Sequence, residues 1–188
     1  MKIILGSQSK CRQNVLKRMG YDFSVMSADI DEKSIRHENP ADLVLLIAQA
    51  KTDVLLSKIQ EPAILITSDQ IILFNGQIRE KPVDEQQAYE FLKTSHLHPV
   101  ETVGAMVVTN TQTGKSVHGL QKGRVYFKPI SEGVILSHIK SGGALRGAGG
   151  FIIDDPIFAP FIEKMEDSMD NVMGLDSELI EKLIQEVL

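Results

Sequence analysis

Residues 62–74 constrain the fold of this chain more than any other segment does. They read PAILITSDQIILF, with apolar residues on both sides of a polar stretch at 67–70. Such a run is typical of a strand in the middle of a sheet. Asp69 lies inside the polar stretch, and a buried carboxylate is costly unless a cation, a metal ion or the open end of the sheet accommodates it. Asp69 is therefore a candidate functional residue; the alternative is an aspartate that caps a turn where the strand ends.

Helical and strand patterns alternate along the rest of the chain. Strands are predicted at residues 2–5 and 23–26 and on either side of a turn at 110–114. Helices are predicted at residues 9–19, 41–58, 84–95, 131–143 and 175–187. This alternation, with hairpins included, predicts an α/β fold with a mixed sheet flanked by helices. The length of 188 residues favours a single domain over residues 1–188.

The helix at 41–58 has the clearest pattern. Asn39 and Pro40 precede it, and Asn is a favoured N-cap while Pro is favoured at the first helical position. Its apolar residues predict one buried face, made of Leu43, Ile47, Ala50 and Val54, with Leu46 and Leu55 beside it.

Two further patterns mark local structure. Asn75-Gly76 predicts a two-residue hairpin turn after the central strand. Asp84 followed by Gln87 has the form of a capping box at the start of the next helix.

Composition and charge exclude several classes of protein. The chain is 43% hydrophobic and 24% charged, as in ordinary globular proteins. A net charge of −5 argues against binding a nucleic-acid polymer or an anionic membrane. The single cysteine, Cys11, excludes an internal disulfide, and we find neither a targeting segment nor an apolar run of membrane-spanning length. We therefore expect a cytoplasmic protein.

The first strand is followed by a polar loop and then a helix. The loop reads Gly-Ser-Gln-Ser, and this layout is that of an anion site, because free N–H groups and the helix dipole favour negative charge there. Ser7 and Ser9 supply hydroxyl donors, and Arg12 lies one turn inside the helix, where it can bind phosphate. The alternative is a serine-capped helix with a surface arginine.

An acidic loop and two lysines complete the candidate site. Asp29, Asp31 and Glu32 form a run of carboxylates that can hold Mg²⁺, although such a run is often only a solvated loop. Lys51 and Lys81 are candidate phosphate-binding residues, with ordinary surface lysines as the alternative. An anion loop, carboxylates for a hard metal ion and lysines together indicate metal-assisted phosphoanhydride chemistry.

Six segments of the chain stand out together: ILGSQSKCR, ADIDEK, IAQAK, ITSDQIILFNGQIREKP, AGGFIIDD and DNVMGL. In order and spacing they resemble the Maf family of nucleoside triphosphate pyrophosphatases. The resemblance implies a mixed α/β fold with two lobes and a central cleft, related to the inosine triphosphatases. It also implies hydrolysis of a nucleoside triphosphate between the α and β phosphates, a divalent cation such as Mg²⁺ or Mn²⁺, and a homodimer.

The resemblance also implies roles for particular residues. The catalytic set comprises Glu32, Lys51, Asp69 and Lys81, of which Glu32 and Asp69 hold the metal ion. The substrate-binding set comprises Ser7, Ser9, Arg12, Gln70 and Asp154. The base is stacked by Phe151, unless that residue packs in the core.

The chain departs from the common family pattern at three places. Lys10-Cys11-Arg12 stands where Pro-Arg-Arg is usual, so one phosphate-binding arginine is missing. Gln70 stands in place of Thr, and Asp154 in place of Gln; both changes resemble the branch that acts on 7-methyl-GTP, and plant Maf-like proteins. A carboxylate can accept hydrogen bonds from the two donors on a guanine edge. Asp155 is the alternative acceptor. The structural alternative is that Asp154 and Asp155 form only a polar turn after a short strand. The rival functions are a dTTP/UTP pyrophosphatase and a non-catalytic nucleotide-binding regulator.

Overall fold

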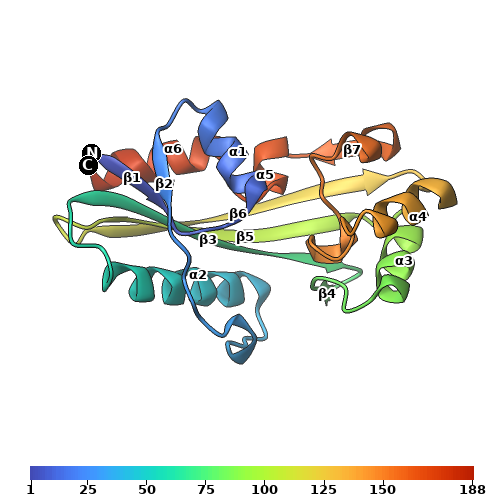
Figure 1. Ribbon diagram of the computed structural model, residues 1–188, viewed down its shortest axis with the longest axis horizontal. Coiled ribbons are helices and arrows are strands. Elements are labelled where there is room, and N and C mark those ends of the chain that lie inside the picture. Colours follow the sequence, from blue (N-terminus) through green and yellow to red (C-terminus); the bar gives the residue numbers. More distant parts are fainter. The chain divides into compact units, whose positions relative to one another are not determined.

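The computed structural model describes all of residues 1–188 and contains one seven-stranded mixed sheet (Figure 1). Its strands, in spatial order, are β2 (Phe23–Val25), β1 (Lys2–Leu5), β3 (Ala63–Phe74), β5 (Val100–Asn110), β6 (Ser116–Phe127) and β7 (Ile162–Glu166), and β4 (Gln77–Arg79) also pairs with β3. β1 is parallel to β2 and β3, whereas β4 and β7 are antiparallel to their partners. The predicted mixed α/β class is confirmed.

Six α-helices and three short 3₁₀ helices accompany the sheet. The α-helices are α1 (Lys10–Arg18), α2 (Pro40–Leu56), α3 (Glu85–Thr94), α4 (Glu132–Lys140), α5 (Met169–Val172) and α6 (Ser177–Val187). The 3₁₀ helices are η1 (Glu32–Ser34), η2 (Ala148–Gly150) and η3 (Pro156–Phe161). No helix combines the length and the apolar character that crossing a membrane requires.

The chain divides into two compact units. Unit 1 comprises Met1–Gln70, Val103–Gln121 and Met173–Leu188, and unit 2 comprises Ile71–Thr102 and Lys122–Val172. The single domain over residues 1–188, and the two lobes with a central cleft, stay predictions.

In unit 1, helices cover both faces of the sheet (Figure 1). α2 lies on one face, while α1 and α6 lie on the other. Leu55 of α2 packs on Ile4, Ala63 and Leu65. A pair of hydroxyls, Thr52 Oγ1 of α2 and Thr67 Oγ1 of β3, also joins this helix to the sheet at 2.6 Å. α2 is therefore fixed against the part of β3 that carries Asp69.

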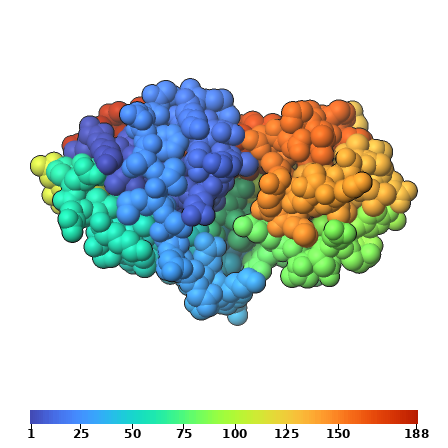
Figure 2. Space-filling model, in the orientation of Figure 1, coloured from blue at the N-terminus to red at the C-terminus, as the bar shows by residue number.

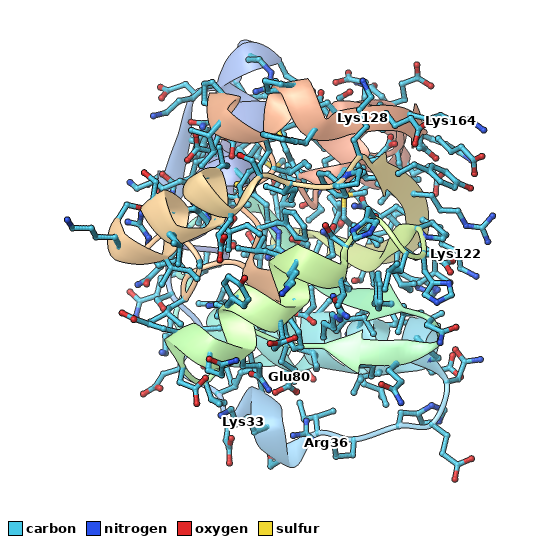
Figure 3. The ribbon with its side chains drawn as sticks, turned by 90° about the vertical axis from the view of Figure 1, so that its right-hand side faces the viewer. Lys33, Arg36, Glu80, Lys122, Lys128 and Lys164 are labelled. Atoms are coloured by element: carbon cyan, nitrogen blue, oxygen red, sulfur yellow. The ribbon has the colours of Figure 1, made fainter.

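In unit 2, an aromatic core supports the glycine-rich segment. The rings of Phe127 and Phe151 stack with centroids 4.7 Å apart, and Phe158 meets Phe151 edge-on at 5.3 Å. Phe151 is therefore a core residue. Lys122 of β6, Lys164 of β7 and Lys128, which follows β6, are exposed and are labelled in Figure 3.

The predicted strands and helices are found within a few residues of their expected bounds, and the hairpin turn is confirmed. Asn75 and Gly76 both have positive φ, 49° and 75°, which suits a tight two-residue turn. β7 and α5 were not predicted from the sequence.

The predicted buried face of α2 is wrong in part. Leu46 is 46% exposed, whereas Lys51, which the pattern leaves off the buried face, is only 8% exposed. The buried side of α2 includes Val44, Ala48 and Lys51. Lys51 can be buried because its ammonium pairs with the carboxylate of Asp69. The capping box at α3 also differs: Asp84 accepts from Gln87 N–H at 2.7 Å, but Gln87 Oε1 accepts from Val83 N–H.

Candidate functional site

The register between β1 and β3 brings the front loop beside the central polar stretch. The two strands are parallel, with Leu5 opposite Ile66, so the loop after β1 begins beside residues 67–70, which lie within β3. Gly6 N–H donates to the Ile66 carbonyl at 2.7 Å. A Cβ at Gly6 would lie 2.6 Å from the Leu55 side chain, so only glycine allows this close approach.

Arg12 of α1 joins three segments of unit 1. Its Nη1 donates to Ser7 Oγ at 3.2 Å and to the Ser68 carbonyl at 3.1 Å. Its Nε donates to the Gly174 carbonyl at 3.2 Å. Arg12 therefore fixes the front loop against β3 and the Gly174 segment, and its expected contact with phosphate stays a prediction.

Lys51 of α2 joins the two carboxylates that were predicted to act together. Its Nζ lies 2.7 Å from Asp69 Oδ1 and 2.9 Å from Glu32 Oε1. Asp69 is buried, with 8% of its surface exposed, whereas Glu32 belongs to a surface segment (Figure 2) from which Lys33 and Arg36 also project (Figure 3). Lys51 is therefore the cation that compensates the buried carboxylate of Asp69.

The two cations converge on one backbone oxygen. Lys51 Nζ donates to the Ser68 carbonyl at 3.4 Å, and Arg12 donates to the same atom. Two positive groups that share one neutral acceptor lie close together, and the site also contains two carboxylates. Such a cluster can bind an anion that brings its own metal ion.

The surroundings shift the pKa values of two of these groups. Burial raises the pKa of Asp69 above its ordinary value, while Lys51 and Arg12 act in the opposite direction. Burial lowers the pKa of Arg12, and Asp69 and Glu32 oppose that shift. A carboxylate with a raised pKa is suited to accept a proton.

The serines support the anion site over the alternative of a capped helix. Ser9 stands at the N-cap position of α1, but its side chain makes no capping hydrogen bond. Ser7 Oγ accepts from Ser9 N–H at 3.2 Å and from Arg12, so its hydroxyl hydrogen can still be donated. Ser9 is therefore the N-cap residue of α1 by position, but its hydroxyl does not cap the helix.

Glu32 and Asp69 fit a magnesium or manganese ion only with help from the substrate. No group of three or more His, Cys, Asp or Glu side chains is arranged to hold a metal. Two carboxylates that meet at Lys51 are nevertheless the usual protein contribution to a Mg²⁺ site, where phosphate oxygens and water complete the ligands.

Gln70 does not share a face of β3 with Asp69. Successive side chains of a strand point to opposite faces. Asp69 accordingly meets α2, while the Gln70 carbonyl accepts from Gln121 Nε2 at 3.3 Å. Its binding role stays a prediction.

Lys81 and Asp154 belong to unit 2, and both are exposed. A backbone hydrogen bond of 3.0 Å, from Gly149 N–H to the Glu80 carbonyl, joins the segments that carry them. Asp155 Oδ1 accepts from Ile157 N–H at 3.1 Å, so that carboxylate already caps η3. The ligand-binding roles of Lys81 and Asp154, and that of Asp155 as the alternative, stay predictions.

Sequence reasoning missed two features of the site. One is the Ser68 carbonyl, a backbone atom for which no residue pattern exists. The other is Gln121 of β6, which is 5% exposed and contacts Gln70. The only signal in the sequence was a polar residue, Gln121, at an inward-facing position of a strand whose side chains alternate between buried and exposed.

The fold and the site define an α/β protein in which cations and carboxylates meet beside the middle of strand β3, where β1 ends. A sequence profile of the family described as "Maf-like protein" matches residues 2–187. The chain therefore belongs to the Maf family.

Its relatives are described by related names. The "7-methyl-GTP pyrophosphatase" of Dictyostelium discoideum is 43% identical over 192 residues, covering 98% of this chain and 96% of that protein. The "dTTP/UTP pyrophosphatase" of Bdellovibrio bacteriovorus is 30% identical, covering 97% and 96%. Among solved structures, a HAM1 protein from Coxiella burnetii covers 99% of both chains, with 12% identity and a TM-score of 0.42. Because this score is low, the fold class rests on the sheet topology.

Proposed function

We propose that this chain is a nucleoside triphosphate pyrophosphatase that cleaves the α–β phosphoanhydride of 7-methyl-GTP or a similar modified nucleotide. The observation that carries the proposal is the convergence of Arg12 and Lys51 on the Ser68 carbonyl, beside Asp69 and Glu32. Similarity to a 7-methyl-GTP pyrophosphatase and to other triphosphate pyrophosphatases supports the reaction class.

In this proposal the front of unit 1 binds the triphosphate. The Ser7 hydroxyl and the N–H groups at the start of α1 donate to phosphate oxygens, with Ser9 beside them. Arg12 and Lys51 offset the charge of the pyrophosphate leaving group. Lys81 of unit 2 is retained as a phosphate-binding residue on the family resemblance alone. Positioning and charge neutralisation account for most of the catalysis of phosphoryl transfer.

Asp69 is proposed as the base that takes a proton from the attacking water. Its raised pKa suits this role, and the Lys51 contact holds its carboxylate in place. Glu32 and Asp69 are the residues that would hold a magnesium or manganese ion. When bound, the ion supplies Lewis-acid polarisation of the phosphate oxygens.

Asp154 is proposed to recognise the base. The guanine edge presents two adjacent N–H donors, and a carboxylate only accepts. Methylation at N7 makes the ring cationic, which adds Coulomb attraction to a carboxylate. Asp155 is the alternative acceptor; its side chain caps η3 and lies 4.0 Å from His138 Nδ1.

A pyrophosphate-release assay tests the proposal. The purified chain is given 7-methyl-GTP, GTP, dTTP or UTP in turn, with Mg²⁺, with Mn²⁺ and with a chelator. We expect the highest kcat/KM for 7-methyl-GTP and no turnover with the chelator. A preference for dTTP and UTP would establish the other branch, and saturable binding without turnover would establish a regulator.

We also propose a cytoplasmic homodimer that binds neither nucleic-acid polymers nor membranes. The net charge of −5 supports the lack of polyanionic partners, and the family resemblance is the reason to expect a dimer. Light scattering coupled to size exclusion measures the mass in solution, and the mass of a single chain would contradict the dimer.

A further inference from the structure

Gln121 reaches across a neighbouring strand to meet Gln70. β5 lies between β6, which carries Gln121, and β3, which carries Gln70, so the two backbones are about 10 Å apart. The residue crossed on β5 is Gly104. A Cβ there would lie 2.9 Å from Gln121 Cγ and 3.1 Å from its Nε2. The missing side chain at Gly104 is what lets the two amides meet over the sheet.

The polarity of this contact follows from its far end. Asp176 N–H donates to Gln121 Oε1 at 3.0 Å, and a backbone N–H can only donate. The Gln121 carbonyl is therefore committed to Asp176, and its NH₂ group faces Gln70. An NH₂ group only donates, so it requires the carbonyl of Gln70, at 3.3 Å. The contact with Asp176 N–H and the contact with Gln70 therefore agree on one amide orientation for each side chain, with the Gln70 carbonyl toward Gln121.

We infer that Gln121 is a positioning residue that holds the Gln70 carbonyl, so that Gln70 meets the nucleotide as a hydrogen-bond donor. The inference rests on the proposed function, because it takes Gln70 as part of the substrate-binding set that the family resemblance implies. A glutamine alone offers either a donor or an acceptor. We call the chain of hydrogen bonds from Asp176 N–H through Gln121 to Gln70 the relay. Because the relay engages the Gln70 carbonyl, the NH₂ group of Gln70 is left to face the ligand. Its counterpart on the ligand is an acceptor oxygen, either a keto group of the base or a phosphate.

The variant Gln121→Glu tests the relay with little change of shape. The introduced carboxylate still accepts from Asp176 N–H but has no donor for Gln70, so the Gln70 amide turns over and donates to it. We expect kcat/KM for 7-methyl-GTP to fall about tenfold, mainly through KM. Gln112→Glu, the same change at an exposed turn residue, is the control and leaves the kinetics unchanged.

Two probes identify the acceptor oxygen. If it is the keto group, Gln121→Glu lowers the preference for GTP over 2,6-diaminopurine riboside triphosphate, which carries an amino group at that position. If the acceptor is a phosphate oxygen, Gln121→Glu leaves this preference unchanged, and inorganic triphosphate inhibits the variant more weakly than it inhibits the wild type. Either result supports the relay.

A second route blocks the relay without changing any polar group. Gly104→Ala places a methyl group against Gln121 and reproduces the loss seen with Gln121→Glu. Gly133→Ala, at a position with open space around it, is its control. The relay also predicts that Gln121→Glu has no further effect in a Gln70→Met background. Wild-type kinetics in Gln121→Glu, or an equal loss in that background, would overturn the inference.

One measurement separates failure of the relay from failure of the proposed function. The side-chain NH₂ signals of Gln70, assigned with Gln70→Met in ¹⁵N-labelled protein, need no substrate. We expect them to shift in Gln121→Glu and to stay in place in Gln112→Glu. Unchanged Gln70 signals in Gln121→Glu would contradict the relay even if the chain hydrolyses nucleotides.

Discussion

At the scale of single residues, the main feature of the site is the ion pair between Lys51 and Asp69. A buried carboxylate and a buried ammonium each need a partner, and here each serves the other at 2.7 Å. The pKa of Asp69 is nevertheless raised, because burial outweighs the two nearby cations. Lys51 therefore fixes the position of the Asp69 carboxylate, and the raised pKa favours proton uptake by Asp69.

The substitution Asp69→Asn separates these two properties. The asparagine carbonyl can still accept from Lys51 Nζ, but it cannot act as a base. We expect turnover of 7-methyl-GTP at saturating Mg²⁺ to fall by about 10²–10⁴ in a pyrophosphate-release assay. Asp53→Asn, at an exposed position of α2, is the control. Turnover close to that of the wild type would remove Asp69 from the chemistry.

His138 links stability to pH in unit 2. It is 1% exposed, and its Nε2 lies 3.1 Å from the Gly150 carbonyl. Burial lowers its pKa, with Arg146 acting in the same direction, while Gly150 and Asp155 oppose the shift. The unfolded chain therefore takes up a proton more readily than the folded one, so stability is full above the ordinary histidine pKa and falls as pH drops through it.

The variant His138→Gln keeps an amide donor for Gly150 but cannot titrate. We expect wild-type Tm to fall more steeply than that of His138→Gln between about pH 7 and pH 5. His118→Gln, at an exposed residue of β6, should follow the wild type. Parallel Tm curves for wild type and His138→Gln would show that His138 contributes nothing to the acid sensitivity.

At the scale of elements, the sequence predicted those parts of the fold that a local pattern specifies. β1, α1 and the hairpin turn follow from apolar runs, helical spacing and turn residues. β7, which reads Ile-Glu-Lys-Met-Glu, was missed because half of it faces solvent and its apolar content is low. Lys51 was placed off the buried face because a helical pattern treats every lysine as polar, and its partners come from other segments.

The glycine turn at η2 has a backbone requirement that can be tested. A Cβ at Gly147 would lie 1.7 Å from the Phe151 carbonyl oxygen, closer than any contact can be. We expect Gly147→Ala to lower the free energy of unfolding by about 3 kcal/mol or more, measured by chemical denaturation. Gly133→Ala, inside α4, should leave stability unchanged or slightly raised. Equal stability of the two variants would show that the turn relaxes easily.

At the scale of the whole molecule, the site depends on segments far apart in the sequence. Arg12, Ser68 and Gly174 meet because β1 pairs with β3 and because the segment before α6 returns to α1. The residue types at these positions were predictable, since acids, cations and hydroxyls stand out in a sequence. Their mutual contacts, and the backbone oxygen at the centre, were not, because they follow from the packing of the whole unit.

The central claim is that Arg12 and Lys51 form one triphosphate site around the Ser68 carbonyl. The most direct test is kcat/KM for 7-methyl-GTP, measured on the wild type, on Lys51→Met and on the exposed-residue control Lys58→Met. The account predicts a loss of about a hundredfold or more for Lys51→Met and none for Lys58→Met. Full activity in folded Lys51→Met would contradict it.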